Sequence, residues 1–159
     1  MPKLLLFAPC EKVAFGQDNS ACLLGILQGF ELSIKSDATE KKTEESNAES
    51  VGEIRVPVRW VIFTMWRLDK DERGKMFEQS CQLITPSGKI SFDQVLEFGQ
   101  EPKEFQRNTM SIFGFPVVEE GEYTLKLWIA ESGKQRGEQA TYPLTIVRKA
   151  DQSSITGVS

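Results

Sequence analysis

The residues whose spacing comes closest to a known chemistry are the acids of segment 69–74, Asp-Lys-Asp-Glu-Arg-Gly. A calcium-binding EF-hand loop also has acids at its first and third positions and glycine at its sixth. Here Arg73 occupies the fifth position, and Ser80 stands where the loop needs a bidentate glutamate. The flanking segments alternate like strands, whereas an EF-hand needs helices. We therefore expect a solvated turn between two strands and no metal.

The chain lacks the residue combinations that usually act as nucleophile and general base in catalysis. The chain has no histidine, which excludes Ser-His-Asp and Cys-His catalysis together with imidazole-bound zinc. Glycine-rich phosphate loops and the G-x-S-x-G nucleophile elbow are absent from the sequence as well. Two carboxylates can converge from distant parts of a fold, so hydrolysis by a carboxylate pair stays open, although no pattern supports it. The sequence predicts a protein that is not an enzyme and takes no cofactor.

The three cysteines, Cys10, Cys22 and Cys81, are odd in number and too widely spaced for a C-x-x-C motif. This usage differs from the disulfide framework of a secreted domain. Cys81 is in phase with neighbouring apolar residues, so we expect a buried, inert thiol. The apolar run at 4–8 is shorter than a signal peptide requires, and no run approaches the length of a membrane span. We expect free thiols and a cytoplasmic location.

Charge limits the partners. The formal net charge is −4, and the lysines and arginines are scattered along the chain. Nucleic-acid binding needs a basic stripe that follows the phosphates, and no such stripe is present. We therefore expect neither a nucleic-acid partner nor a membrane partner.

Two tryptophans are the candidate binding residues. Trp128 falls on the polar face of the strand that contains Tyr123, and Trp66 ends the strand that contains Trp60. A flat ring outside the core can form a sugar platform or a protein hot spot, because it offers a large contact area at a small entropy cost. Burial beneath a loop or a neighbouring strand is the more common arrangement for such a ring. The candidate site residues are Trp66 and Trp128.

Alternation of apolar and polar residues recurs along the chain, which is typical of strands with one buried and one solvated face. One long strand is predicted at 22–34, with its even positions facing inward and a bend at Gly25 and Gly29. The other predicted strands are a buried first strand at 4–8, a central strand at 56–66, a strand at 77–84 closed by a turn at 85–88, and a terminal hairpin from 121 to 146. Residues 89–98 alternate like a strand and also fit one helical face, and we predict a strand there.

Segment 121–129 gives the clearest prediction of a strand. Its start, Gly121-x-Tyr123, resembles the tyrosine corner of immunoglobulin-like domains, in which the hydroxyl bonds to upstream backbone. We expect the Tyr123 ring in the core and its hydroxyl bonded to nearby backbone. Pro143 lacks the N–H that a central ladder uses, so we expect the last strand at a sheet edge.

Two polar segments interrupt the pattern. Residues 35–53 have almost no large apolar side chains and cannot offset the entropy of ordering, so we expect a mobile insert. Residues 150–159 are small and polar, and we expect a flexible tail. The remainder of residues 1–149 is long enough for one domain with its own core.

The order of segments resembles an uncharacterised bacterial family of small β-sandwich proteins, a domain of unknown function. The resemblance spans roughly residues 3–148 and rests on element order. It is carried by the N-terminal apolar strand, Leu24-Gly25-Ile26-Leu27, the central strand, Thr85-Pro86-Ser87-Gly88 and Gly121-Glu122-Tyr123-Thr124-Leu125. The insert at 35–53 departs from the compact connection expected there. The resemblance implies a fold and a bacterial source, and it assigns no activity and no site residue.

The sequence predicts an all-β protein, a single antiparallel β-sandwich of about seven to nine strands with an immunoglobulin-like or C2-like topology. The predicted function is a non-catalytic cytoplasmic protein-binding or assembly module. The alternative is a small-ligand or carbohydrate-binding β-sandwich. A flat apolar patch beside an edge strand would favour the first function, and a concave site with convergent polar groups would favour the second.

Overall fold

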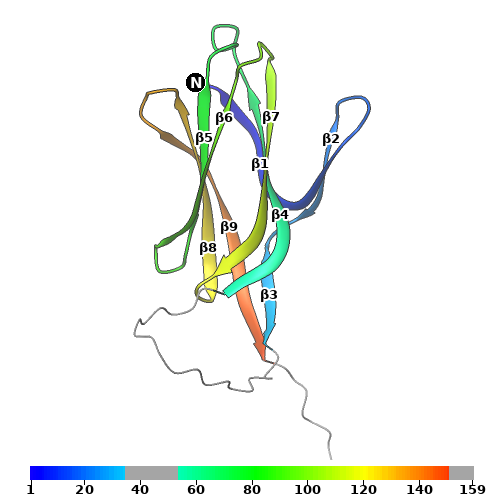
Figure 1. Cartoon of the computed structure of the whole chain (residues 1–159), viewed down its shortest axis with the longest axis vertical. Coiled ribbons are helices and arrows are strands. Elements are labelled where there is room, and N and C mark those ends of the chain that lie inside the picture. Colours follow the sequence, from blue (N-terminus) through cyan, green and yellow to red (C-terminus); the bar gives the residue numbers. More distant parts are fainter. Residues whose placement is uncertain (35–53, 151–159) are drawn as a thin grey trace, which may run out of the picture.

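The structure is a computed structural model that describes residues 1–34 and 54–150 (Figure 1). The predicted mobile insert at 35–53 lies outside the described residues, as does the predicted tail beyond Ala150. Ala150 itself ends the last strand. No helix in the two described stretches has the length and the apolar character needed to cross a membrane.

The described residues form nine strands and no helix. The strands are β1 (Lys3–Phe15), β2 (Ala21–Ile26), β3 (Gly29–Ile34), β4 (Ile54–Arg67), β5 (Phe77–Ile84), β6 (Ile90–Phe98), β7 (Phe105–Val117), β8 (Gly121–Glu131) and β9 (Gly137–Ala150). They build a four-stranded sheet in the order β2-β1-β4-β7 and a five-stranded sheet in the order β3-β9-β8-β5-β6. The all-β prediction is confirmed for this part of the chain.

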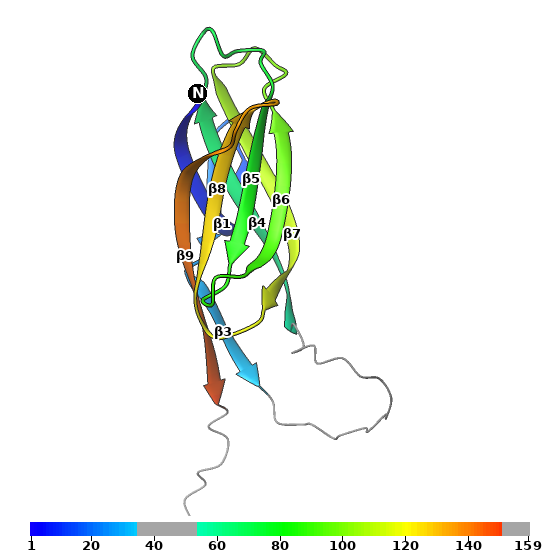
Figure 2. The same ribbon diagram turned by 90° about the vertical axis from the view of Figure 1, so that its left-hand side faces the viewer.

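The two sheets enclose one core. In Figure 2 strands β9, β8, β5 and β6 lie in front of β1, β4 and β7. Aromatic rings link the two layers: Phe115 of β7 lies 5.5 Å from Trp60 of β4 and 5.8 Å from Tyr123 of β8 between ring centroids. Phe30 of β3 approaches the Phe115 ring to 4.6 Å. The five-stranded sheet is curled like half a barrel, so the architecture is established only as two sheets around a shared core.

The prediction of a wholly antiparallel fold is wrong at one pair. Strand β3 pairs with β9 in parallel, from Gly29 opposite Thr145 to Ile34 opposite Ala150. The long strand predicted at 22–34 is also wrong, because the chain leaves one sheet and enters the other at Leu27 and Gln28. The Leu27 N–H donates to the Pro9 carbonyl (2.9 Å), and the Gln28 carbonyl accepts from the Thr145 N–H (3.0 Å).

Glycine permits this crossing. Gly29 has φ of 157°, and a Cβ built there would lie 1.9 Å from the Thr145 carbonyl oxygen. The bend that the sequence predicts at Gly25 and Gly29 is therefore present, but it separates two strands. The crossing also changes the inward face: in β2 the even positions Leu24 and Ile26 face solvent, and Leu27 is the buried residue.

Strand β7 is not predicted from the sequence. Its alternation is masked because Phe105 and Phe113 are exposed while Asn108 is buried. The edge position predicted for the last strand is correct only for its first half. Pro143 pairs with Thr124 of β8, and β3 joins the other side of β9 only from Thr145 onward.

Two local predictions are confirmed. Tyr123 is fully buried, and its hydroxyl accepts from the N–H groups of Val118 (2.9 Å) and Glu119 (3.0 Å) while donating to the Glu119 carbonyl (2.9 Å). The turn at 85–88 is closed by the Gly88 N–H, which donates to the Thr85 carbonyl (2.9 Å). This turn joins β5 to β6.

Candidate functional site

Strand β1 changes its pairing partner at Cys10. Residues 3–10 pair with β4, and residues 10–15 pair with β2. In Figure 1 the chain descends from the N-terminus, curves, and rises again into a hairpin that projects from the body. We call this two-stranded ribbon, residues 11–26, the arm. The free edge of β2 makes the arm one side of the four-stranded sheet.

The tip of the arm is tied to β7 through Arg107. The Arg107 guanidinium donates to the Asn19 carbonyl and to Asn19 Oδ1 (2.7 Å), and it lies 5.4 Å from the centre of the Phe15 ring. Asn19 has φ of 68°, a left-handed conformation that asparagine tolerates better than most residues. Asp18 braces the turn by accepting from the Ser20 N–H (3.1 Å) and hydroxyl (2.6 Å). These contacts hold the tip across the outer face of the sheet.

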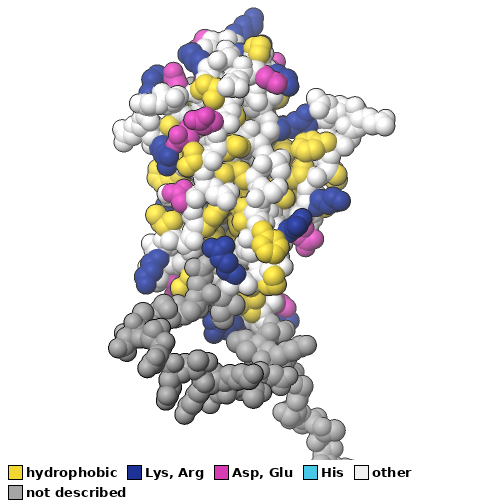
Figure 3. All heavy atoms as spheres, in the orientation of Figure 1, with side chains coloured by type: hydrophobic (Ala, Val, Ile, Leu, Met, Phe, Trp, Pro, Cys, Tyr) yellow, Lys and Arg dark blue, Asp and Glu magenta, His cyan; other side chains and the backbone are white. Residues whose placement is uncertain are grey.

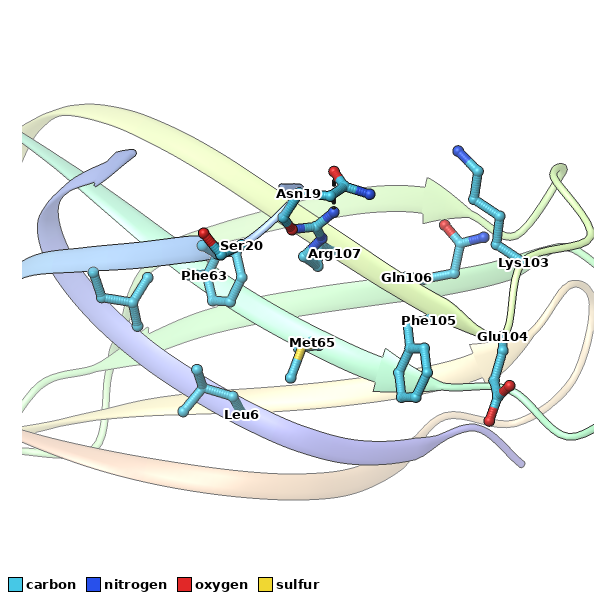
Figure 4. Close-up of a pocket in the computed structure, with 12 residues that line it drawn as sticks. Leu6, Asn19, Ser20, Phe63, Met65, Lys103, Glu104, Phe105, Gln106 and Arg107 are labelled. Atoms are coloured by element: carbon cyan, nitrogen blue, oxygen red, sulfur yellow. Dashed lines mark hydrogen bonds between the residues drawn. The ribbon is translucent and has the colours of Figure 1, made fainter. Parts of the chain in front are cut away.

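A hollow of about 710 Å³ lies beneath the arm. Figure 4 shows Phe63 and Met65 of β4 and Leu6 of β1 along its floor, with Arg107 reaching toward Asn19. Phe63 is only 1% exposed although it points away from the core between the sheets, so the arm and its neighbours cover it. Leu23 of β2 and Phe105 of β7 also line this hollow. The floor and sides are therefore largely apolar.

A second hollow of about 580 Å³ continues along the same face. Residues 103–107 of the chain line the first hollow, and Thr109 and residues 111–113 line the second, so the Arg107 contact lies between them along β7. The second hollow is lined by Val13 and Phe15 of the arm, by Arg59 and by the exposed Phe113. The Arg59 guanidinium lies 5.9 Å from the centre of the Phe113 ring.

Two arginines bring positive charge to this face. Among the described residues, neither Arg107 nor Arg59 forms an ion pair with a carboxylate. Glu104 lines the first hollow, but its carboxylate binds Arg67 (3.2 Å) and Arg73 (3.3 Å). The arm face thus combines apolar surface with two arginines that no carboxylate of the described residues neutralises.

The side of the arm that faces away from the hollow also has apolar side chains, beside Lys12, the cross-strand neighbour of Leu24. Leu24 is 46% exposed and Ile26 is 53% exposed, and Cys22 beside them is exposed as well. In Figure 3 the hairpin projects from the body and apolar side chains lie open at the surface beside it. Most two-stranded ribbons in water have one polar face. This ribbon has apolar side chains on both.

The structure places the two candidate tryptophans on different sheets and away from the arm. Trp66 is 0% exposed and lies in the core, so it offers no surface to a ligand, and we do not propose it as a binding residue. Its indole N–H donates to Gln79 Oε1 (2.8 Å). Thr64 (2.7 Å) and Asn108 (3.0 Å) donate to the same oxygen, so a buried polar network occupies this end of the core.

Trp128 lies on the outer face of the five-stranded sheet and is partly exposed. The Lys126 ammonium lies 5.9 Å from the centre of its ring. Its indole nitrogen is shielded and has no hydrogen-bond partner among the described residues, and the same holds for the hydroxyl of Ser80, its cross-strand neighbour. No hollow that we describe includes Trp128, so the sequence prediction of a platform there finds no concave partner.

The remaining candidates are structural. Segment 69–74 forms a turn in which Glu72 accepts from the Asp69 N–H (2.9 Å) and pairs with the N-terminal amino group. No cluster of three or more metal-ligating side chains occurs in the part of the chain that the structure describes. Cys10 and Cys81 are buried and Cys22 is exposed, and all three are free. Burial raises the pKa of Cys81 to about 12 and also raises that of Cys10, so neither is a nucleophile at neutral pH.

No protein-family model matches the chain, and no curated protein sequence is significantly similar to it. The arm and its hollows are therefore the features from which a function can be inferred. The sequence analysis missed them, because an alternating pattern does not show which strand changes partner. One signal was available: Ala21–Ile26 contains neither a charged residue nor a proline, the residues that usually protect an edge strand.

Proposed function

We propose that this chain is a non-catalytic protein-binding or assembly module that docks its partner on the arm. The observation that carries the proposal is the free edge of β2, which is uncharged and has Leu24 and Ile26 half exposed. Edge strands with unpaired N–H and C=O groups are normally protected by lysine, proline or a bulge, because they otherwise pair with other chains. The β2 edge has neither lysine nor proline and is therefore suited to binding.

The partner is an extended segment that adds a strand to β2. Backbone hydrogen bonds would supply affinity, and side chains at alternate positions would supply specificity. Those side chains would lie beside Cys22, Leu24 and Ile26, so the partner segment needs apolar residues at every second position. Burial of the two aliphatic side chains would add to the binding free energy in proportion to the apolar area removed from water.

We also propose the wider setting predicted from the sequence. The shared core and the buried Tyr123 hydroxyl support a β-sandwich of immunoglobulin-like or C2-like topology. The three free cysteines support a cytoplasmic location. The absence of histidine and the raised pKa of Cys81 support a role without catalysis.

A small-ligand function is the second candidate. It is favoured by the hollow beneath the arm and by Arg107, whose charge no carboxylate neutralises among the described residues. The carbohydrate version of this alternative depended on the tryptophans. Trp66 is buried, and Trp128 lies outside the described hollows.

Cys22 makes the docking proposal testable. Its thiol is exposed beside Leu24, so a photoactivatable cross-linker can be attached there, and proteins captured in extract of the native host can be identified. The captured protein is then purified, and its affinity for the unlabelled chain is measured. Leu24→Lys/Ile26→Lys should weaken binding at least about tenfold, because it places two charges where apolar contacts form.

The matched control is Ile90→Lys/Val95→Lys on β6. These side chains are 58% and 49% exposed on the edge strand of the other sheet. The control should leave the affinity unchanged within about twofold, and both double variants should melt like the parent because the replaced residues are exposed. A partner whose binding is unaffected by the β2 changes but lost with the β6 changes would overturn the proposal.

A further inference from the structure

We propose that the first hollow beneath the arm binds a free aliphatic carboxylate, with Arg107 binding the carboxylate and the apolar floor covering the chain. This site is separate from the docking surface, because Leu23 lines the hollow while Leu24 and Ile26 face away from it. The two proposals therefore depend on different side chains.

The lining suits an aliphatic chain. Leu6, Leu23, Phe63, Met65 and Phe105 contribute apolar side chains from four strands. Leu6 and Phe105 are 39% and 50% exposed, so their apolar surface is available to a ligand. Small-molecule sites have this composition, with mostly apolar walls and a few polar groups that fix the orientation of the ligand.

Arg107 supplies the polar group. A guanidinium carries five N–H donors, and Asn19 accepts from two of its nitrogens. The remaining donors are available to an acceptor, and a carboxylate is a stronger acceptor for guanidinium than an amide oxygen. The described residues provide no carboxylate for it, because Glu104 is bound by Arg67 and Arg73. Charge complementarity therefore points to an anion.

The dimensions favour a small molecule. The volume of about 710 Å³ lies within the range of small-ligand pockets. The arm crosses this face at Asn19, where Arg107 would hold the carboxylate next to the tip. The chain of the ligand would then lie toward Phe105 and Leu6.

Methionine methyl groups provide a local readout. Of the four methionines, Met65 lines this hollow, whereas Met110 lies in the core, Met76 lines a different hollow and Met1 is exposed at the N-terminus. The full chain with labelled methionine methyl groups is titrated with decanoate, and with decanol and decyltrimethylammonium as neutral and cationic controls. We expect decanoate to shift the Met65 signal alone, and to bind at least about tenfold more tightly than either control.

Two arginine variants complete the test. Arg107→Gln should weaken decanoate binding about tenfold or more, because a charge-assisted hydrogen bond is lost. Arg59→Gln is the control: this arginine lies on the same face and also lacks a carboxylate partner in the described chain, but it lines the second hollow. The proposal would be overturned by equal affinity of the chain for decanoate and decanol, or by ligand-induced shifts of the Met110 methyl signal. Equal losses of decanoate affinity in the two arginine variants would also overturn it, as would a chain that binds no decanoate and only a peptide with a C-terminal carboxylate.

Discussion

Several cross-strand polar pairs lie on the outer face of the five-stranded sheet, whereas the two arginines beside the arm on the four-stranded sheet have no such pair in the described chain. On the first face Lys126 pairs with Glu138 (3.2 Å), Arg136 with Glu78, and Gln82 with Asp93 (3.0 Å). On the second face two arginines lie on phenylalanine rings and have no carboxylate partner in the described chain. The charged side chains named on the first face thus neutralise one another, whereas the two arginines of the second face meet no carboxylate in the described chain.

This difference separates stability from function. Exposed ion pairs contribute little to the free energy of folding, so the pairs of the five-stranded sheet chiefly keep that face compatible with water. The arm gives up this protection and leaves apolar side chains open on both of its sides. Contiguous exposed apolar surface in a folded domain generally marks an interaction site. Substitutions of exposed residues in the arm should therefore weaken binding of a partner without lowering the stability of the fold.

The largest expected effect contrasts Tyr123 with Leu24. Tyr123→Ala should lower the free energy of unfolding by roughly 3 to 5 kcal/mol, because it leaves a cavity and removes a fully buried ring. Tyr123→Phe should lower it by about 1 kcal/mol or more, since three backbone hydrogen bonds lose their partner. Leu24→Ala should change it by less than about 0.5 kcal/mol. Urea denaturation measures all three, and an equal loss for Leu24→Ala would place the arm in the folding core.

The next effect is a loss of stability at alkaline pH through Cys81. Its pKa is raised from 9.0 to about 12 by burial, so the folded chain keeps a proton that the unfolded chain releases. The stabilisation is complete below pH 9 and is lost as the pH rises toward 12, by up to roughly 4 kcal/mol. The free energy of unfolding, measured by denaturation at several pH values across this range, should depend less on pH in Cys81→Ala than in the parent. An unchanged dependence would assign the effect to other groups.

A smaller and local effect is expected when the arm is released. Arg107→Ala should reduce global stability by about 1 kcal/mol or less, because the contacts it makes are exposed. Amide hydrogen exchange in residues 12–24 should nevertheless become faster, since a two-stranded ribbon is marginally stable without support. Arg59→Ala serves as the comparison and should leave exchange in the arm unchanged. Faster exchange throughout the four-stranded sheet would show that the arm is part of a larger cooperative unit.

The smallest effect should appear at the arm tip in acid. The Ser20 hydroxyl and N–H lower the pKa of Asp18 below its ordinary value of 3.8. The ionised Asp18 carboxylate therefore stabilises the turn fully at pH values above 3.8. This stabilisation is lost as the pH falls through the lowered pKa. Backbone NMR signals of residues 16–20 should shift in this range, and Asp18→Asn should abolish the shift. A titration midpoint above 3.8 would show that the Ser20 contacts do not form in solution.

The sequence predicted correctly those elements whose residue pattern fits only one kind of local structure. Tyr123 combines a glycine turn with regular alternation, and both its burial and its hydroxyl bonds follow from that. Pro143 correctly marks an edge, but only until β3 pairs beyond it, because a proline reports on its own position and not on the whole strand.

The candidate site depends on pairing, which an alternating pattern does not contain. The arm exists because β1 exchanges β4 for β2 at Cys10, and nothing in the alternation of residues 3–15 records that exchange. Trp66 was a candidate binding residue because it ends a strand, and the alternative weighed beside that role, burial, is what Gln79 and the facing sheet give it. Residues that line the hollow come from β1, β2, β4 and β7, and only the folded chain brings them together.

The parallel pairing of β3 with β9 has a consequence for how the protein is made. Residues 29–34 find their partner only at residues 145–150, so five-stranded pairing stays incomplete until the ribosome has synthesised nearly all of the described chain. Pairings between segments so far apart in sequence also slow folding, because the loop between them must close before any contact forms. During translation β3 would remain a second unpaired edge next to the uncharged β2. A nascent chain of this protein therefore presents two neighbouring unpaired strands, and β9, the last strand to be made, pairs with β3 while the edge of β2 stays free.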